Sequence, residues 1–265
     1  MEPFIQQCKE SVWKYKGMWE DFSSTVGFWA DMEHPYVTYD NNFIESEWWA
    51  LKEIWEKGLL YKGFKIVPYC PRCGTPLSAQ EVSQGYKTVK ERSAIVRFKV
   101  VGEDAYFLAW TTTPWTLPSN VALCVNPDEQ YVKVKAADGY TYYMAEALLD
   151  TVLGSLEREE GTPAYEVLET YVGKDLEYKE YEPLYNFKEL NKKAHYVVCD
   201  SYVTLTDGTG VVHIAPAFGE DDSKVGRKYD LPFLQLVDEK GEMTAETKWA
   251  GTCLLYTSDA ADEED

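Results

Sequence analysis

The stretch that decides both the fold and the candidate site is Trp110-Thr-Thr-Thr-Pro-Trp-Thr-Leu-Pro-Ser-Asn120. Its first three threonines follow a segment of alternating apolar residues, and two prolines then fix a turn. Hydroxyl and amide groups on short side chains donate and accept hydrogen bonds without filling much space. At the end of a strand such residues can line a small polar pocket, although composition alone favours an exposed, threonine-rich turn.

The segments on either side of this stretch show the period of two that is typical of strands. Val96, Phe98 and Val100 alternate with charged residues, and Tyr106, Leu108 and Trp110 repeat the pattern. We expect further strands at 121–125, 131–135, 140–144, 164–172, 195–205 and 210–214, with a hairpin through Asp138-Gly139 and helices at 145–153 and 220–229. Many strands and few helices predict an α+β fold whose β-barrel-like domain spans residues 93–250.

The N-terminal part has a different pattern, with apolar residues at helical spacing over 4–20 and 44–60. Asn42, with Glu45 three residues later, is the expected N-cap of the second helix, and Gly58 falls near its end. The aromatic segment between the helices is predicted to be a packed loop. We therefore expect a helical segment at 1–66, a connector at 67–92, and an unstructured tail or sequence artefact at 251–265.

Composition narrows the class of protein. The chain has 265 residues, 45% of them hydrophobic, and a formal charge of −19. A broad basic face for duplex DNA is not expected at this charge. Because no signal peptide or long apolar run is present, we expect a soluble, cytoplasmic chain without a membrane partner. The six cysteines form one close pair, which favours a reducing compartment over a disulfide framework.

That pair lies in Cys70-Pro-Arg-Cys73-Gly74. Two thiolates at this spacing, in a tight turn that ends in glycine, are half of a tetrahedral zinc site. Since the remaining cysteines and histidines are scattered, the other two ligands are not evident. A redox pair or incidental turn cysteines are the alternatives.

A second polar stretch is Gly208-Thr-Gly-Val-Val-His-Ile-Ala-Pro-Ala-Phe-Gly-Glu-Asp-Asp222. A glycine-rich turn leads into a short buried strand containing His213, and a helix then begins with three acids. These acids can simply cap the helix, and His213 can simply be a core histidine. Brought to one pocket with the threonines, however, a carboxylate and an imidazole would suit an aminoacyl ester with its ammonium group.

The two stretches resemble the two signature stretches of the editing domain of isoleucyl-tRNA synthetases, which are class I enzymes. The run Tyr69-Cys-Pro-Arg-Cys-Gly-Thr-Pro-Leu77 and the segment Asn41-Asn-Phe-Ile-Glu-Ser-Glu-Trp-Trp49 also resemble the region leading into that domain. The resemblance covers roughly residues 1–250. Valyl and leucyl relatives carry an arginine after two threonines, where this sequence has Thr113-Pro114, so the isoleucyl family is favoured.

The resemblance implies an editing region that hydrolyses the ester of mischarged valyl-tRNA(Ile), preceded by a helical segment from the side of the Rossmann catalytic domain. It implies catalytic roles for Thr112, Thr113, His213 and Asp222. It implies substrate-binding roles for Thr111, Trp115 and Asn120. It implies zinc ligation by Cys70 and Cys73, with the second cysteine pair beyond the editing domain. The implied partners are the acceptor end of tRNA(Ile) and valine, and the implied state is a monomer.

The sequence departs from the complete family pattern. The His-Ile-Gly-His and Lys-Met-Ser-Lys-Ser types of motif, which bind ATP in this class, are absent from it. ATP and magnesium are therefore expected only in a full-length enzyme, and this chain is not expected to aminoacylate tRNA. The alternatives are the editing domain of a valyl or leucyl relative and a non-catalytic tRNA-binding or zinc-ribbon module.

Overall fold

The computed structural model describes residues 1–88, 90, 92–156 and 163–254. The chain divides into two compact units, Met1–Phe64 and Lys65–Asp265, and each is described by itself. The predicted tail falls partly outside this description, since residues 255–265 are not described.

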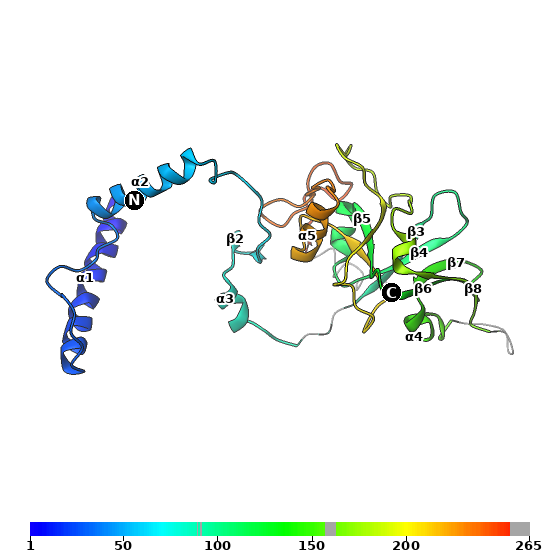
Figure 1. Ribbon diagram of the computed structural model, residues 1–265, viewed down its shortest axis with the longest axis horizontal. Helices are drawn as coiled ribbons and strands as arrows, with labels where there is room; N and C mark the ends of the chain where they lie inside the picture. The colour runs from blue at the N-terminus through cyan, green and yellow to red at the C-terminus, as the bar shows by residue number, and fades with distance from the viewer. Residues whose placement is uncertain (89, 91, 157–162, 255–265) are drawn as a thin grey trace. The chain divides into compact units, whose positions relative to one another are not determined.

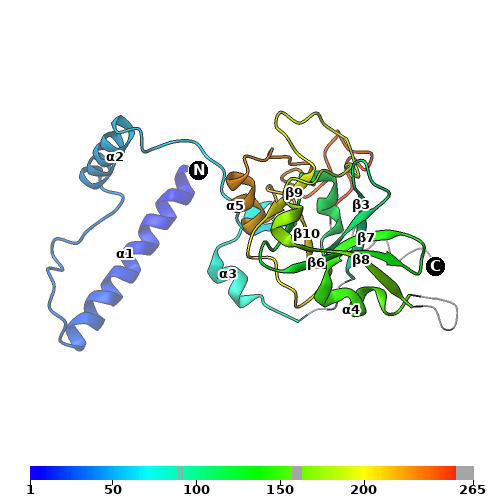
Figure 2. The same cartoon turned by 45° about the vertical axis from the view of Figure 1, so that its right-hand side comes forward.

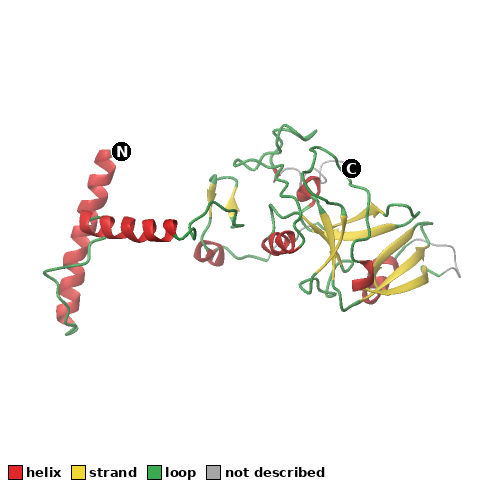
Figure 3. Cartoon of the chain, turned by 45° about the horizontal axis from the view of Figure 1, so that its top comes forward, coloured by secondary structure: helices red, strands yellow, loops and turns green. Residues whose placement is uncertain are grey.

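The first unit consists of two helices, α1 (Glu2–Thr25) and α2 (Asn41–Glu56), joined by a loop (Figure 3). Both helices were predicted, but α2 begins earlier than expected, with Asp40 at its N-cap instead of Asn42. Gly58 lies just beyond its end in the left-handed region, with φ of 68°. The prediction of a packed loop is wrong: Trp29 is 94% exposed and Tyr36 80% exposed, because neither helix of this fully described unit buries a residue.

The second unit opens with a small connector. Strands β1 (Tyr69–Cys70) and β2 (Thr75–Pro76) pair antiparallel, and helix α3 (Ala79–Gln84) follows. Ser78 caps α3 in a reciprocal capping box, since its hydroxyl accepts from the Glu81 N–H and the Glu81 carboxylate accepts from the Ser78 N–H.

A curled, mixed sheet forms the body of this unit (Figure 2). The alternation of apolar residues predicted most of its strands within two residues of their observed bounds. They are β3 (Ala94–Lys99), β4 (Tyr106–Thr111), β5 (Ala122–Val125), β6 (Gln130–Ala136), β7 (Thr141–Ala145), β8 (Tyr165–Val172), β9 (Tyr196–Cys199) and β10 (Val211–Ile214). The predicted strand at 195–205 is shorter than expected, because the chain turns after Cys199.

The order of the strands is β8-β6-β7-β4-β10-β5-β9, and β3 pairs with β4. Neighbours β6 and β7 form the hairpin expected from Asp138-Gly139, where Gly139 has φ of 88°. The pairs β4–β7, β4–β10 and β5–β9 are parallel, whereas β5–β10 is antiparallel. The α+β fold with a β-barrel-like domain after a helical segment is therefore confirmed.

Short helices lie at the ends of the strands. They are η1 (Pro114–Ser119), η2 (Glu146–Leu148), α4 (Leu149–Leu153), η3 (Gly173–Leu176) and α5 (Glu220–Lys228). Figure 1 shows α4 next to β6 and β8, and α5 near β5. Three acids in the first turn of α5 and two basic residues in its last turn match the helix dipole.

Two hydrophobic clusters hold the sheet. The larger contains Phe98, Phe107, Tyr131 and Tyr143, each at most 1% exposed. The smaller joins β5 and β9 to α5 through Val198, among other residues. Burial of this apolar surface is the main source of stability for the unit.

The chain remains ordered beyond residue 250, which differs from the predicted start of the tail at 251. The Met243 N–H donates to the Thr252 carbonyl, and the Leu254 N–H donates to the Gly241 carbonyl. Residues 251–254 therefore pair with the turn at 241–243.

Candidate functional site

The first wall of the candidate site is the turn after β4, where Thr111 ends the strand and η1 begins. The Thr113 N–H donates to Thr111 Oγ1 at 3.0 Å, and Thr116 Oγ1 donates to the Thr113 carbonyl at 2.8 Å. Pro114 occupies the first turn of η1, where its missing N–H costs nothing. Local hydrogen bonds thus gather the hydroxyls of Thr111, Thr113 and Thr116 on one side.

The second wall is β10, which lies beside β4 with Val212 in register with Trp110. Neighbouring parallel strands place the next pair of side chains, Thr111 and His213, side by side. His213 Nε2 lies 3.0 Å from Thr116 Oγ1 and 3.4 Å from Thr111 Oγ1. Residues 102 positions apart in the sequence thus meet in one hydroxyl–imidazole cluster, defined as Thr111, Thr113, Thr116 and His213.

The contacts of Thr116 indicate which ring nitrogen of His213 carries the hydrogen. Because Thr116 places its only hydroxyl hydrogen on the Thr113 carbonyl, it accepts a hydrogen bond from Nε2–H. Burial lowers the pKa of His213 to about 4, so the imidazole is neutral at pH 7. Nδ1 therefore carries a lone pair, and this buried atom has no hydrogen-bond partner among the described residues.

The carboxylate of Asp222 lies in the first turn of α5. Its Oδ2 accepts from the Ala215 N–H at 2.9 Å, which ties the helix to the end of β10 two residues beyond His213. Burial raises the pKa of Asp222 to about 6, although the Ala215 N–H lowers it in part. A methyl group on Gly219 would lie 2.8 Å from Asp222 Cγ, so this glycine provides the space that the carboxylate occupies.

A second contact joins the two motifs near Asp222. The rings of Trp115 and Phe218 meet edge to face with centroids 5.2 Å apart. No hydrogen bond between Asp222 and the cluster is present among the described residues. The structure thus brings Thr111, Thr113 and His213 into contact, and the backbone at Ala215 connects Asp222 to the strand that carries His213.

Two predicted residues have other surroundings. Thr112 is exposed. Asn120 uses both ends of its amide within the protein, since Nδ2 donates to the Ala122 carbonyl at 2.8 Å and Oδ1 accepts from the Tyr181 hydroxyl at 2.6 Å. Its buried amide therefore frames the turn.

Thr116 is the residue that the sequence analysis missed. It follows Thr113 by three positions, and in a 3₁₀ turn side chains three apart lie on the same side. The signal was available in Thr-Pro-Trp-Thr, because Pro114 favours a tight helical turn at that point.

The cysteine pair adopts a knuckle-like turn. The Cys73 N–H donates to Cys70 Sγ at 3.4 Å, and Gly74, with φ of 65°, completes the turn. The Cys73 backbone N–H lowers the pKa of Cys70. The turn fits two of four zinc ligands. In the described part of the chain, no group of three or more histidine, cysteine or acidic residues could hold a metal ion.

The mixed β-barrel-like unit is similar in fold to a solved structure. The crystal structure of GlLeuRS-CP1 superposes with a TM-score of 0.51 at 11% identity, covering 65% of this chain and 94% of that chain. At this identity the likeness concerns the fold alone.

The family is decided by sequence comparison. The family model for class I tRNA synthetases (I, L, M and V) matches residues 1–249, so the chain belongs to this family. Isoleucine–tRNA ligase of Clostridium kluyveri is 54% identical over 261 residues, which are 98% of this chain and 24% of the relative. Isoleucine–tRNA ligase of Picrophilus torridus is 45% identical, with 98% of this chain and 24% of the relative covered.

The chain thus spans about a quarter of the length of the curated relatives it matches. The predicted membership in the class I synthetase family is confirmed. Within the described residues, no helix has both the length and the apolar character needed to cross a membrane.

Proposed function

We propose that this chain is the editing region of an isoleucyl-tRNA synthetase and hydrolyses the ester of valyl-tRNA(Ile). The observation that carries the proposal is the hydroxyl–imidazole cluster, in which Thr116 lies 3.0 Å from a neutral His213. The proposed division is a helical segment at 1–66, a connector at 67–92 and the editing domain at 93–250.

Asp222 binds the α-ammonium group of the amino acid. With a pKa of about 6 the carboxylate is mostly ionised at pH 7.5, and its partial burial strengthens an ion pair with the ligand. The Ala215 N–H donates to Oδ2, and the ammonium group binds at the other carboxylate oxygen, Oδ1. Gly219 keeps that position open.

His213 and Thr116 form the walls of the space for the amino-acid side chain. A rigid wall is needed because one methylene group in a hydrophobic pocket is worth only about 1–3 kcal/mol, for which the selection of isoleucine over valine is itself the standard example. A second, smaller site that admits valine and excludes isoleucine supplies the remaining selectivity.

Water is the nucleophile. Its oxygen bonds to the ester carbonyl carbon, the ester C–O bond breaks, and the products are valine and the terminal ribose hydroxyl of the tRNA. Thr112 and Thr113 orient the water and the terminal adenosine. Thr111 and Trp115 line the substrate site. Catalysis then rests on positioning and polar stabilisation, without a covalent intermediate.

The remaining assignments concern the full-length enzyme. ATP and magnesium serve its aminoacylation reaction, and the acceptor end of tRNA(Ile) is the partner of this region. When bound, zinc would be held by Cys70 and Cys73 together with ligands from elsewhere, and it would stabilise the connector. We place the enzyme in the cytoplasm and regard the chain as a monomer.

A deacylation assay tests the proposal. The wild-type chain should hydrolyse valyl-tRNA(Ile) and spare isoleucyl-tRNA(Ile), and Asp222→Ala should lose activity. Asp221→Ala is the matched control, since this neighbouring carboxylate is exposed and pairs with Lys224 at 2.9 Å. Equal, slow hydrolysis by wild type and Asp222→Ala would support a non-catalytic tRNA-binding module, whereas sparing of valyl or leucyl esters would indicate the corresponding relative.

A further inference from the structure

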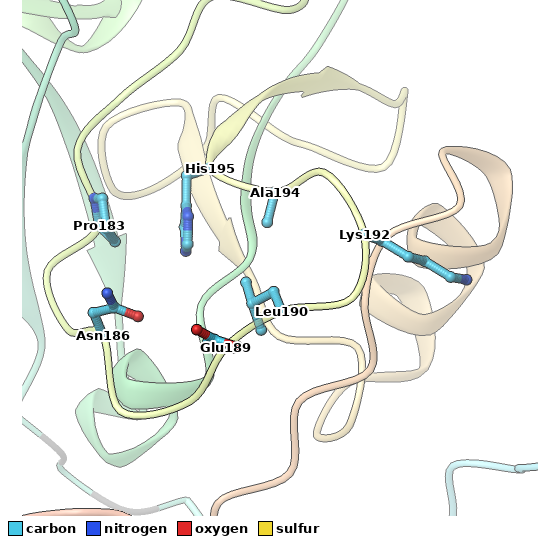
Figure 4. Close-up of a pocket in the computed structure, with 7 residues that line it drawn as sticks. All are labelled: Pro183, Asn186, Glu189, Leu190, Lys192, Ala194 and His195. Atoms are coloured by element: carbon cyan, nitrogen blue, oxygen red, sulfur yellow. The ribbon is translucent and has the colours of Figure 1, made fainter.

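A separate pocket lies in the segment between η3 and β9, away from the hydroxyl–imidazole cluster. It has a volume of about 350 Å³, and its walls are formed by Pro183, Asn186, Glu189, Leu190, Lys192, Ala194 and His195. Figure 4 shows Pro183, Asn186 and His195 around the same opening, with Lys192 extending away. The walls therefore combine apolar surfaces with a carboxamide, an imidazole, the Glu189 carboxylate and the stem of Lys192.

The wall that contains Asn186 is held by aromatic packing. Tyr185 and Phe187, on either side of it, stack with centroids 5.4 Å apart, and both rings meet Trp249 edge to face. Although Asn186 itself is exposed, its backbone is thus fixed between two anchored neighbours. A carboxamide held in this way can offer a donor and an acceptor side by side.

The opposite wall is His195, whose backbone is in the left-handed region with φ of 61°. A residue other than glycine is uncommon there, and it persists when the surroundings enforce it. The His195 N–H donates to the Val121 carbonyl at 2.7 Å, and its carbonyl accepts from the Tyr181 N–H at 3.0 Å. The imidazole packs edge to face on Tyr181, and burial lowers its pKa.

Three lysines and one carboxylate lie along the segment that forms this pocket. Lys188, Lys192 and Lys193 occur within six residues that also contain Glu189, in a chain whose formal charge is −19. Lys192 pairs with Asp230 at 2.6 Å and Lys193 with Glu180 at 2.7 Å, but these side chains are 41–84% exposed. Exposed pairs contribute little, so these lysine side chains can turn from their carboxylate partners towards a phosphate group.

We propose that this pocket binds one unpaired nucleobase of a single-stranded RNA segment. A base would lie against the imidazole and the apolar walls, Asn186 would pair with its hydrogen-bonding edge, and the lysines would meet the adjacent phosphates. Unstacked bases are recognised in this way, by rings and amides beside a basic groove. The inference rests on the proposed function in that tRNA would supply the RNA.

Fluorescence anisotropy of the full 265-residue chain tests this inference with a labelled eight-nucleotide RNA of mixed sequence. The same backbone without bases reports phosphate binding alone, and adenosine and cytidine monophosphates report free nucleotides as competitors. Asn186→Ala and His195→Asn should each weaken binding of the intact RNA about tenfold, the loss typical of one base contact. Asparagine keeps the left-handed backbone at 195.

Asn191→Ala is the matched control, because it makes the same change at an exposed position of the same loop. Unchanged affinity in Asn186→Ala, or equal binding of the intact and base-free RNA, would overturn the inference. Asn186→Ala decides the matter if His195→Asn fails to fold. Competition by the free nucleotides supports the base pocket and identifies a mononucleotide as a sufficient ligand. RNA binding at this pocket is measured without any deacylation step. Failure of the binding prediction and failure of the proposed hydrolysis can therefore be told apart.

Discussion

Asp222→Asn should make the chain more stable at neutral pH while it removes the proposed ammonium contact. Burial raises the pKa of Asp222 from its ordinary value of 3.8 to about 6. This difference of about two pH units corresponds to about 3 kcal/mol, at about 1.36 kcal/mol for each unit. The folded state holds the proton more tightly, so the contribution of Asp222 to stability is highest below about pH 4 and is lost as the pH rises through about 6.

Asparagine does not titrate, so it avoids this loss. It also makes a weaker hydrogen bond with the Ala215 N–H than a carboxylate does, which costs about 1 kcal/mol. The net gain in the free energy of unfolding at pH 7.5 is therefore about 1–2 kcal/mol. Deacylation by the wild type should rise with pH through about 6, as the carboxylate ionises.

Urea unfolding at pH 4 and pH 7.5, followed by near-ultraviolet circular dichroism, measures the effect. The stability difference between Asp222→Asn and wild type should widen by up to about 3 kcal/mol between the two pH values. Asp221→Asn, at an exposed position, should keep the wild-type pH dependence. A constant difference between Asp222→Asn and wild type across this range would refute the reasoning.

Three further substitutions test other contacts. Thr116→Val removes the acceptor of His213 Nε2–H and should lower single-turnover deacylation at least about tenfold, an effect of about 1.4 kcal/mol. Gly219→Ala places a methyl group 2.8 Å from Asp222 Cγ and should raise KM about tenfold, since the carboxylate must move. Burial raises the pKa of Glu103, but hydrogen bonds from two lysines and a tyrosine outweigh this effect and lower the pKa to about 2. Glu103→Gln should therefore lower the free energy of unfolding by about 1–2 kcal/mol at pH 7 and by almost nothing near pH 2. Urea unfolding measures this difference.

Matched changes elsewhere serve as controls. Thr204→Val alters an exposed threonine outside the candidate site, and full loss of activity in it would undermine the role given to Thr116. Gly17→Ala adds a methyl group with nothing within 4 Å, so an equal rise in KM would point to a general effect of the substitution. A Glu103→Gln penalty that persists at pH 2 would contradict the ion-pair explanation.

Local patterns predicted the elements of the sheet well, because strand alternation and turn residues are short-range signals. Residues 106–111 and the Asp138-Gly139 hairpin were found where expected. The parallel pairing of β4 with β10 was beyond such signals, since it joins distant segments through backbone hydrogen bonds. For this reason the resemblance between motifs, and not periodicity, placed Thr111 and His213 together.

The errors have physical causes too. The aromatic segment at 28–39 was expected to be packed because aromatic residues usually are, yet within this unit Trp29 is almost fully exposed. The hydrogen bond from the Tyr181 hydroxyl to the side-chain oxygen of Asn120, 61 residues away, was not predicted. Contacts of this range cannot be deduced from one sequence stretch.

The position of β10 has a consequence for the order in which the protein is made. This strand is the last of the sheet in sequence, yet it lies between β4 and β5 and joins the two parts of the strand order. A chain emerging from the ribosome therefore holds its threonines long before the imidazole that contacts them. Because such distant pairing forms late, the site is assembled only when synthesis has passed residue 214, and a truncated product would carry one wall without the other.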